Sequence, residues 1–154
     1  MKKFFRVLLP FLLCFSVCFS MLSLSVGGKE EDRNEIYSLF CDLTPYEVAL
    51  LESAVEATVP EGSFALRVSV ASVILNRLDS PLYPDSLPKI VRGSSFLEDG
   101  SAVPSKKTRQ AVLSALLGAS PVFRSTHALK LTEDEEIPAE AVSFVVIDGW
   151  VFWE

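Results

Sequence analysis

Residues 64–77, FALRVSVASVILNR, constrain the fold more than any other part of the chain. The run lies between Pro60 and Pro81, and its apolar residues occupy almost every side of a helical wheel. The β-branched residues would also permit a strand, but a run of this length without a turn signal favours a helix. A helix that is apolar all round is a buried one. We therefore expect a central helix, capped by Ser63 and running from Phe64 to Arg77, with other elements packed around it.

A second helix is predicted just before the central one. In TPYE, residues 44–47, Thr44 can act as the cap, Pro45 fits the first helical position and Glu47 completes a capping box. The helix is expected to end near Ala57, because Pro60 disfavours a helical residue before it.

Two shorter helices are predicted after the central one. Ser86 can start one helical turn that Gly93 stops. Ser105 can cap a longer amphipathic helix that Gly118 closes.

The C-terminal part changes from helical to strand-like periodicity. Residues 143–153, SFVVIDGWVFW, contain two apolar runs around Asp148-Gly149, which is a strong hairpin signal. Residues 127–131, HALKL, are a candidate third strand, and the acidic insert between is expected to be a solvent-exposed loop. Helices first and a small antiparallel sheet last predict the α+β class.

Residues 1–27 are predicted to be a leader outside the folded domain. Lys2, Lys3 and Arg6 precede an apolar run that reaches about Val26, without any acidic residue. The run is close to the ~20 residues that span a bilayer, so a cleaved signal peptide and a retained N-terminal membrane anchor, touching the membrane through residues 4–26, both stay open. The basic start predicts export of the remainder in either case.

Residues 28–43 are polar and charged, and we interpret them as a linker with a short helix at residues 36–41. Residues 44–154 then form one domain, which fits the length of the chain.

The charge and the rare residue types exclude several function classes. Beyond the leader there are 11 basic and 20 acidic residues, a net charge of −9, so phosphates would be repelled and a nucleic-acid partner is not expected. Cys14 and Cys18 lie in the leader, which leaves Cys41 alone and predicts no disulfide in the domain. His127 is the single histidine and is expected to be structural, so neither a His-rich metal site nor a cofactor is predicted.

Glu56 is the candidate general acid. It lies in the last turn of the first long helix, near small residues, with Glu52 one turn back and no basic residue on the same face. A neighbouring like charge raises the pKa of a carboxyl group, and a raised pKa suits proton donation. The alternative is that both glutamates are surface residues on a helix flank.

Asn76 and Arg77 are expected to act on the fold. Asn is a frequent helix terminator, and Arg interacts favourably with the negative end of a helix. We expect both to hold buried backbone groups, with contact to a substrate as the alternative.

Several motifs together resemble a known family. They are AVEA at 54–57, VSVASVILNR at 68–77, SPLYP at 80–84, a loop from Phe96 to Ser101, AVLSALLG at 111–118 and IDGWVFW at 147–153. In these the chain resembles the catalytic domain of the spore cortex-lytic cell-wall hydrolases, the SleB/CwlJ family, over roughly residues 44–153. The segment from LNR to YP is the most specific part.

The resemblance implies a lysozyme-like helical core with a small C-terminal antiparallel sheet, acting on peptidoglycan glycan strands in the cell wall or spore cortex. It implies that Glu56 protonates the glycosidic oxygen, as in a glycan hydrolase or a lytic transglycosylase, without a second catalytic carboxylate. Phe96 and Ser101 then belong to a substrate-binding loop, and Asn76 and Arg77 buttress the glutamate helix.

Trp150 stands where the family has a histidine. Strand alternation puts Trp150 and Phe152 on one face and Val151 and Trp153 on the other, with one face over the helices and the other toward solvent or the cleft. We predict that Trp150 binds substrate by stacking on a sugar, with a place in the core as the alternative.

Two further departures from the family leave other functions open. The loop after Glu56 is about two residues longer than in the family, which makes Glu61 the next candidate acid, and the exported part is strongly acidic. The alternatives are a non-catalytic relative that binds peptidoglycan or a protein partner, and a membrane-anchored adaptor whose acidic face recruits a basic partner.

Overall fold

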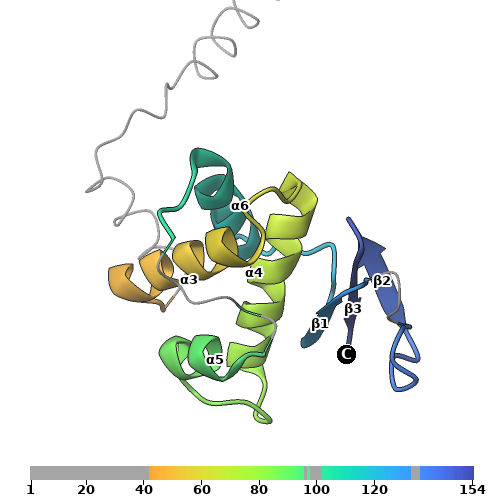
Figure 1. The fold of residues 1–154 in the computed structure, drawn as a ribbon. Helices are drawn as coiled ribbons and strands as arrows, with labels where there is room; N and C mark the ends of the chain where they lie inside the picture. Colours follow the sequence, from red (N-terminus) through yellow and green to blue (C-terminus); the bar gives the residue numbers. More distant parts are fainter. Residues whose placement is uncertain (1–41, 96, 98–101, 133–135) are drawn as a thin grey trace, which may run out of the picture. The chain divides into compact units, whose positions relative to one another are not determined.

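The computed structural model describes residues 42–95, 97, 102–132 and 136–154. In these ranges the chain forms four helices and then a three-stranded antiparallel sheet, which confirms the predicted α+β class (Figure 1). The predicted leader, the short helix at 36–41 and the loop residues Phe96 and Ser101 lie outside the described residues. Among the residues that are described, no helix combines the length and the apolar character needed to cross a membrane.

Helix α3, Pro45–Thr58, begins as its sequence predicts. The Thr44 hydroxyl accepts a hydrogen bond from the Glu47 N–H at 3.2 Å, and the Glu47 carboxylate accepts one from the Thr44 N–H at 2.9 Å. This capping box satisfies N–H groups that have no partner within the helix. The helix ends at Thr58, one residue beyond the predicted end, with Val59 non-helical ahead of Pro60.

Helix α4, Phe64–Asp79, is the predicted central helix. The Ser63 hydroxyl caps it by accepting from the Leu66 N–H at 3.1 Å. The buried face continues almost all round the helix, and α4 packs against α3, α5, α6 and β1 (Figure 1). The helix continues two residues past the predicted end at Arg77. Its end is set by Pro81, since the preceding Ser80 is extended, with φ −93° and ψ 130°.

Helices α5, Leu87–Gly93, and α6, Lys106–Leu116, complete the helical layer. The Ser105 hydroxyl caps α6 by accepting from the Thr108 N–H at 3.3 Å. Gly118, in the left-handed region with φ +87°, closes it as predicted by donating to the Ala115 carbonyl at 2.9 Å. The buried stripe of α6 lies against α4.

The sheet contains β1, His127–Lys130, β2, Phe144–Ile147, and β3, Trp150–Trp153, in the order β1-β3-β2. The predicted hairpin and third strand are therefore both present. Asp148 and Gly149 have φ values of 49° and 75°. Positive φ at both central residues is what a two-residue type I′ hairpin turn requires.

Strand β3 is buried on both faces. Trp150 and Phe152 join the main core with α3, α4 and α6, whereas Val151 and Trp153 form a second small cluster with Ala141. The predicted pairing of side chains on the two faces is confirmed. The expectation that the second face meets solvent or a cleft is wrong, because the segment around Ala141 covers it.

Candidate active site

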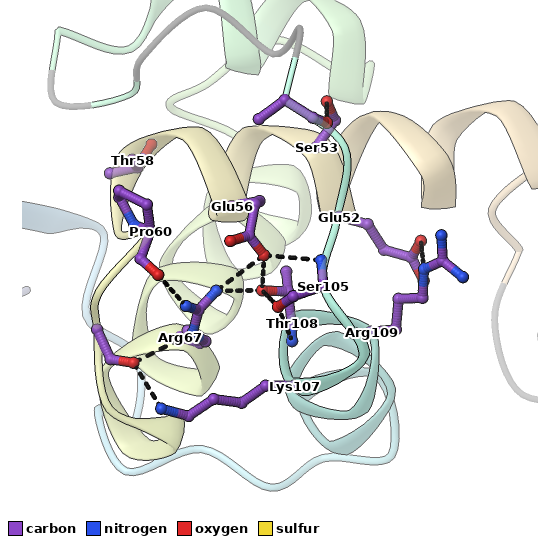
Figure 2. Close-up of polar contacts among 12 residues, drawn as sticks. Glu52, Ser53, Glu56, Thr58, Pro60, Arg67, Ser105, Lys107, Thr108 and Arg109 are labelled. Carbon is purple, nitrogen blue, oxygen red and sulfur yellow. Dashed lines mark hydrogen bonds and ion pairs between the residues drawn. The ribbon is translucent and has the colours of Figure 1, made fainter.

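Glu56 lies where three helices meet (Figure 2). It sits in the last turn of α3, and its carboxylate reaches Arg67 on α4 and the first turn of α6. Its side chain is 13% exposed, so the carboxyl group is largely but not fully removed from water. A group with this exposure can still meet a ligand at the surface.

The described residues make all their hydrogen bonds to the Glu56 carboxylate through one oxygen, Oε2. This atom accepts from Arg67 Nη1 at 3.0 Å, from the Ser105 N–H at 2.9 Å and, at short range, from the Thr108 hydroxyl. Within the part of the chain that the structure describes, Oε1 has no hydrogen-bond partner. The two oxygens of this carboxylate therefore have different environments.

Arg67 is the cation that holds this carboxylate. Its side chain is 4% exposed, and its guanidinium donates to the Gly62 carbonyl at 3.2 Å and to the Pro60 carbonyl and Thr108 hydroxyl at shorter range. Two of these acceptors belong to the loop between α3 and α4. A buried cation needs such partners, because its desolvation is otherwise unfavourable by several kcal/mol. Arg67 thus fixes the loop, Glu56 and the start of α6 relative to one another.

The protonation state of Glu56 differs from the sequence-based expectation. Burial raises the pKa of its carboxyl group, but the hydrogen bonds from Thr108 and Ser105 and the positive charge of Arg67 outweigh it and lower the pKa from 4.5 to about 2. The expected raised pKa, inferred from the absence of a basic residue on the same helix face, is wrong for the free protein. The cation comes from the neighbouring helix, 11 residues later in the chain.

Glu52, the expected source of like-charge repulsion, has a cation of its own. Its Oε2 lies 3.9 Å from Nε of Arg109 on α6, and its side chain is 8% exposed. Each of the two glutamates on this face of α3 is therefore matched to an arginine from a different helix. The interpretation of both as surface residues on a helix flank does not fit this burial.

Asn76 and Arg77 contact backbone groups, as the sequence predicts. Asn76 Nδ2 donates to the Ser125 carbonyl at 2.9 Å, and Arg77 Nε donates to the Thr126 carbonyl at 2.5 Å. Arg77 also donates to the Ser94 hydroxyl at 2.6 Å. These bonds tie the last turns of α4 to the segment entering β1 and to the end of α5. The structural role of the two residues remains a prediction, with contacts that support it.

The aromatic residues near the end of α4 form a separate group. The guanidinium carbon of Arg77 lies 4.9 Å from the Tyr83 ring centroid, and His127 stacks on Trp153 with centroids 5.1 Å apart. Tyr83 Oη lies 3.4 Å from His127 Nε2. The single histidine is thus packed between two aromatic rings, which fits the structural role expected for it.

The structure does not support Trp150 as a substrate-binding residue. Its side chain is 7% exposed and belongs to the main core with Phe152. An indole enclosed in this way has no free face to stack on a sugar, so the prediction is corrected to a core role. Phe96 and Ser101 lie outside the described residues, and their predicted contact with substrate stays a prediction.

Sequence reasoning missed Arg67 and Thr108 and treated Ser105 only as a helix cap. One signal was available: Arg67 is the lone charged residue in the first three turns of α4. Because a buried charge must be paired, a carboxylate partner could have been predicted for it. The two other donors to Glu56 could not have been predicted, since Thr108 and Ser105 lie more than 40 residues away from it in the chain.

A pocket of about 480 Å³ lies elsewhere, between the C-terminal halves of α4 and α6 and the segment that follows α6. Asn76, Asp79, Phe123 and Arg124 are among its lining residues, and Glu56 is not. The carboxylate at the junction of the three helices is therefore a separate surface site.

The fold and the site define a class of protein. A helical core carries one partly exposed glutamate at a helix end, and a small antiparallel sheet packs against the central helix. This is the lysozyme-like arrangement that the motifs predict.

Comparison with solved structures identifies the particular fold. The chain superposes on the catalytic domain of Bacillus cereus SleB with a TM-score of 0.63 and 18% identity, covering 83% of this chain and 99% of that one. It matches the catalytic domain of the germination-specific lytic transglycosylase SleB of Bacillus anthracis with the same TM-score and identity, covering 73% and 98%. At this identity the likeness establishes the fold, and the predicted lysozyme-like core is confirmed.

Three relatives with similar sequences are spore cortex-lytic enzymes. The chain is 35% identical over 80 residues to the spore cortex-lytic enzyme of Oceanobacillus iheyensis and 34% identical over 80 residues to that of Bacillus subtilis. It is 33% identical over 86 residues to the enzyme of Halalkalibacterium halodurans. These matches cover 49%, 49% and 53% of this chain and 29%, 26% and 26% of the relatives, so the chain spans less than a third of their length. No family model matches the chain. The resemblance to spore cortex-lytic enzymes read from the motifs is confirmed.

Proposed function

We propose that this chain carries an exported peptidoglycan-cleaving domain that acts on glycan strands of the spore cortex or cell wall, with Glu56 as the general acid. The observation that carries the proposal is the placement of Glu56: it matches the glutamate of the AVEA motif, and one of its carboxylate oxygens has no hydrogen-bond partner among the residues that the structure describes. The fold shared with the SleB catalytic domains supports it.

The proposed reaction is that of a lytic transglycosylase. Glu56 Oε1 donates a proton to the glycosidic oxygen between the two amino sugars, and the bond from that oxygen to the anomeric carbon breaks. The leaving sugar departs as an alcohol. A hydroxyl of the muramic acid then forms a bond to its own anomeric carbon and returns its proton to Glu56, so a second carboxylate nucleophile is not needed, unlike in the two-carboxylate scheme.

This role requires Glu56 to gain a proton that it lacks at neutral pH in the free protein. A glycan strand lying over the carboxyl group would remove its remaining water, and removal of water favours the neutral form. Because kcat/KM reports the ionisation of free enzyme, it should rise as the pH falls toward the pKa of Glu56. The proposal therefore includes an acidic pH optimum for glycan cleavage.

The leader supports the proposed location. Its basic start and apolar run are typical of an export signal or an N-terminal anchor, and peptidoglycan lies outside the membrane. In either form the domain from residue 44 onward would meet its substrate in the extracytoplasmic space.

The test is digestion of purified spore cortex and of vegetative wall by the purified chain, with mass analysis of the fragments. Fragments ending in an anhydro-sugar indicate a lytic transglycosylase, and fragments with reducing ends indicate a hydrolase. Glu56→Gln keeps the shape of the side chain but cannot donate the proton, so cleavage should fall by about 10²–10⁴-fold. Exposed Glu140→Gln removes the same charge elsewhere and should leave cleavage unchanged.

Two outcomes would contradict this proposal. Wild-type cleavage by Glu56→Gln would reject Glu56 as the acid, and Glu61→Gln would then be assayed next. Absence of cleavage by the wild-type chain across the acidic and neutral range would instead favour a non-catalytic relative that binds peptidoglycan.

A further inference from the structure

The guanidinium of Arg67 is held from several sides at once. Gly62 and Pro60 accept from it on the loop after α3, Thr108 accepts from it on α6, and Glu56 accepts from it on α3. Two of these four partners, the Gly62 and Pro60 carbonyls, make no contact with Glu56. Arg67 therefore has a fixed position whether or not the glutamate is charged, and of the two Glu56 oxygens its Nη1 contacts Oε2.

We propose that Arg67 is a positioning residue for Glu56, pinning Oε2 as a permanent hydrogen-bond acceptor so that Oε1 is the atom that carries the transferred proton. This inference rests on the function proposed above and names a residue that the motifs do not include. It follows from the convergence of the Arg67, Ser105 and Thr108 donors on Oε2.

The chemistry of a carboxyl group explains why Oε2 accepts hydrogen bonds and Oε1 carries the proton. A neutral carboxyl group has one oxygen that carries the proton and one that accepts hydrogen bonds. With donors already directed at Oε2, protonation there would oppose N–H and O–H groups with another O–H. Protonation at Oε1 keeps every existing bond and directs the acidic proton away from the three donors.

The other charged side chains near Glu56 contact other groups. Glu52 on the same helix is paired with Arg109 of α6, and Lys107 of α6 donates to the Gly62 carbonyl at 2.9 Å. Glu61 lies in the exposed loop after α3. Among the described residues, Arg67 is the one cation within ion-pair distance of Glu56, and its charge contributes to the lowered pKa of the carboxyl group.

The experiment compares two cations that hold the same loop. Arg67→Gln removes the cation that touches Glu56, whereas Lys107→Gln removes an exposed cation that shares the Gly62 carbonyl but does not contact Glu56. The first readout is titration of the Glu56 carboxyl carbon by NMR in ¹³C-labelled protein, with Glu56→Gln to assign the signal. The second is the pH profile of cleavage of soluble cortex fragments.

In Arg67→Gln we expect the Glu56 midpoint to rise and the acid-dependent limb of the cleavage profile to move with it, because the charge of Arg67 contributes to the lowered pKa of Glu56. The maximal rate should fall by about 10²-fold, since loss of the fixed geometry by ~1 Å has an effect of that size. Arg67→Lys keeps the charge and should keep the low midpoint while losing part of the rate. Lys107→Gln should change neither readout.

An unchanged Glu56 midpoint in Arg67→Gln, or an equal shift in Lys107→Gln, would overturn the inference. If Arg67→Gln does not fold, Thr108→Val removes another Oε2 donor without removing a charge, and the same rise in midpoint is expected. An unchanged midpoint in that variant is equally contrary to the inference. The titration does not depend on cleavage, so failure of the proposed function, an inactive wild type, is distinguishable from failure of the role of Arg67.

Discussion

The side-chain amide of Asn76 donates a hydrogen bond of 2.9 Å to the carbonyl of Ser125, 49 residues later in the chain. The contact joins the last turns of the central helix to the segment that enters the first strand. Arg77 extends it by donating to the next carbonyl, that of Thr126, at 2.5 Å. Two adjacent side chains thus satisfy two adjacent backbone groups, and they link the helical layer to the sheet without a disulfide.

Replacement of Asn76 by Ala should destabilise the protein and leave the chemistry of Glu56 intact. The Ser125 carbonyl, in a residue that is 6% exposed, would lose its side-chain donor, and an unsatisfied buried group costs about 1–3 kcal/mol. Urea denaturation measures the change. Asp79→Ala, at an exposed position in the same last turn, is the control and should shift the free energy of unfolding by less than about 0.5 kcal/mol. Lost cleavage in a fully stable Asn76→Ala protein would instead place Asn76 in the active site.

The pH dependence of stability should carry a contribution from Glu56. Its pKa is lowered from 4.5 to about 2 on folding, so the folded state binds the proton less well than the unfolded state. The stabilisation is fully present above pH 4.5 and is lost as the pH falls toward 2. A lowering of the pKa by this amount corresponds to a contribution of roughly 3 kcal/mol to the free energy of unfolding.

The measurement compares wild type with Glu56→Gln by urea denaturation at pH 7, 4 and 2.5, because all other groups titrate in both proteins. At pH 7 the Gln variant should be the less stable, since Arg67 is left without its counter-charge. The difference in the free energy of unfolding between the two proteins should decrease by roughly 3 kcal/mol as the pH falls. A gap that stays constant over this range would show that Glu56 has an ordinary pKa.

Much of the fold could be predicted because its signals are local. Thr44 with Glu47, Ser63 and Ser105 each mark a helix start through a side chain that bonds to a backbone group three residues away. Asp148-Gly149 marks the hairpin because both residues tolerate positive φ. The end of α4 was misplaced because Asn76 and Arg77 resemble terminators, although the stronger steric signal is Pro81.

The site was predicted less completely because its contacts are not local. Glu56 could be singled out from the motif, but the groups that set its pKa come from α4 and α6. Helical spacing describes only neighbours on one helix, and it gave the wrong direction for the pKa shift. Likewise, strand alternation paired Trp150 with Phe152 correctly, but it could not show that Ala141 covers the opposite face.

Trp150 should behave as a core residue rather than as a sugar platform. Trp150→Ala should lower the free energy of unfolding by about 3–5 kcal/mol, as large-to-small changes of aromatic core residues do, while Trp150→Phe should lower it by less. The chain contains two tryptophans, so Trp153→Phe leaves Trp150 as the only tryptophan, whose emission can be excited selectively. Its emission should be blue-shifted, resist quenching by acrylamide and stay constant when soluble cortex fragments are added. A shift on adding the fragments would restore the stacking role.

The hairpin turn provides a prediction about backbone conformation alone. A methyl group added at Gly149 or at Gly93 would meet no atom within 4 Å, so neither substitution is opposed by packing. Gly149 has φ +75°, in the left-handed region, whereas Gly93 is the last residue of α5 and has no positive φ. Gly149→Ala should therefore destabilise the protein by about 1–2 kcal/mol, and Gly93→Ala should be neutral or stabilising by up to about 1 kcal/mol. The turn also positions Asp148, whose carboxylate accepts from the Ser63 N–H at 3.1 Å beside the start of α4. Thermal melting of the two variants side by side is the measurement, and an equal effect of both would show that the turn does not require a left-handed residue at position 149.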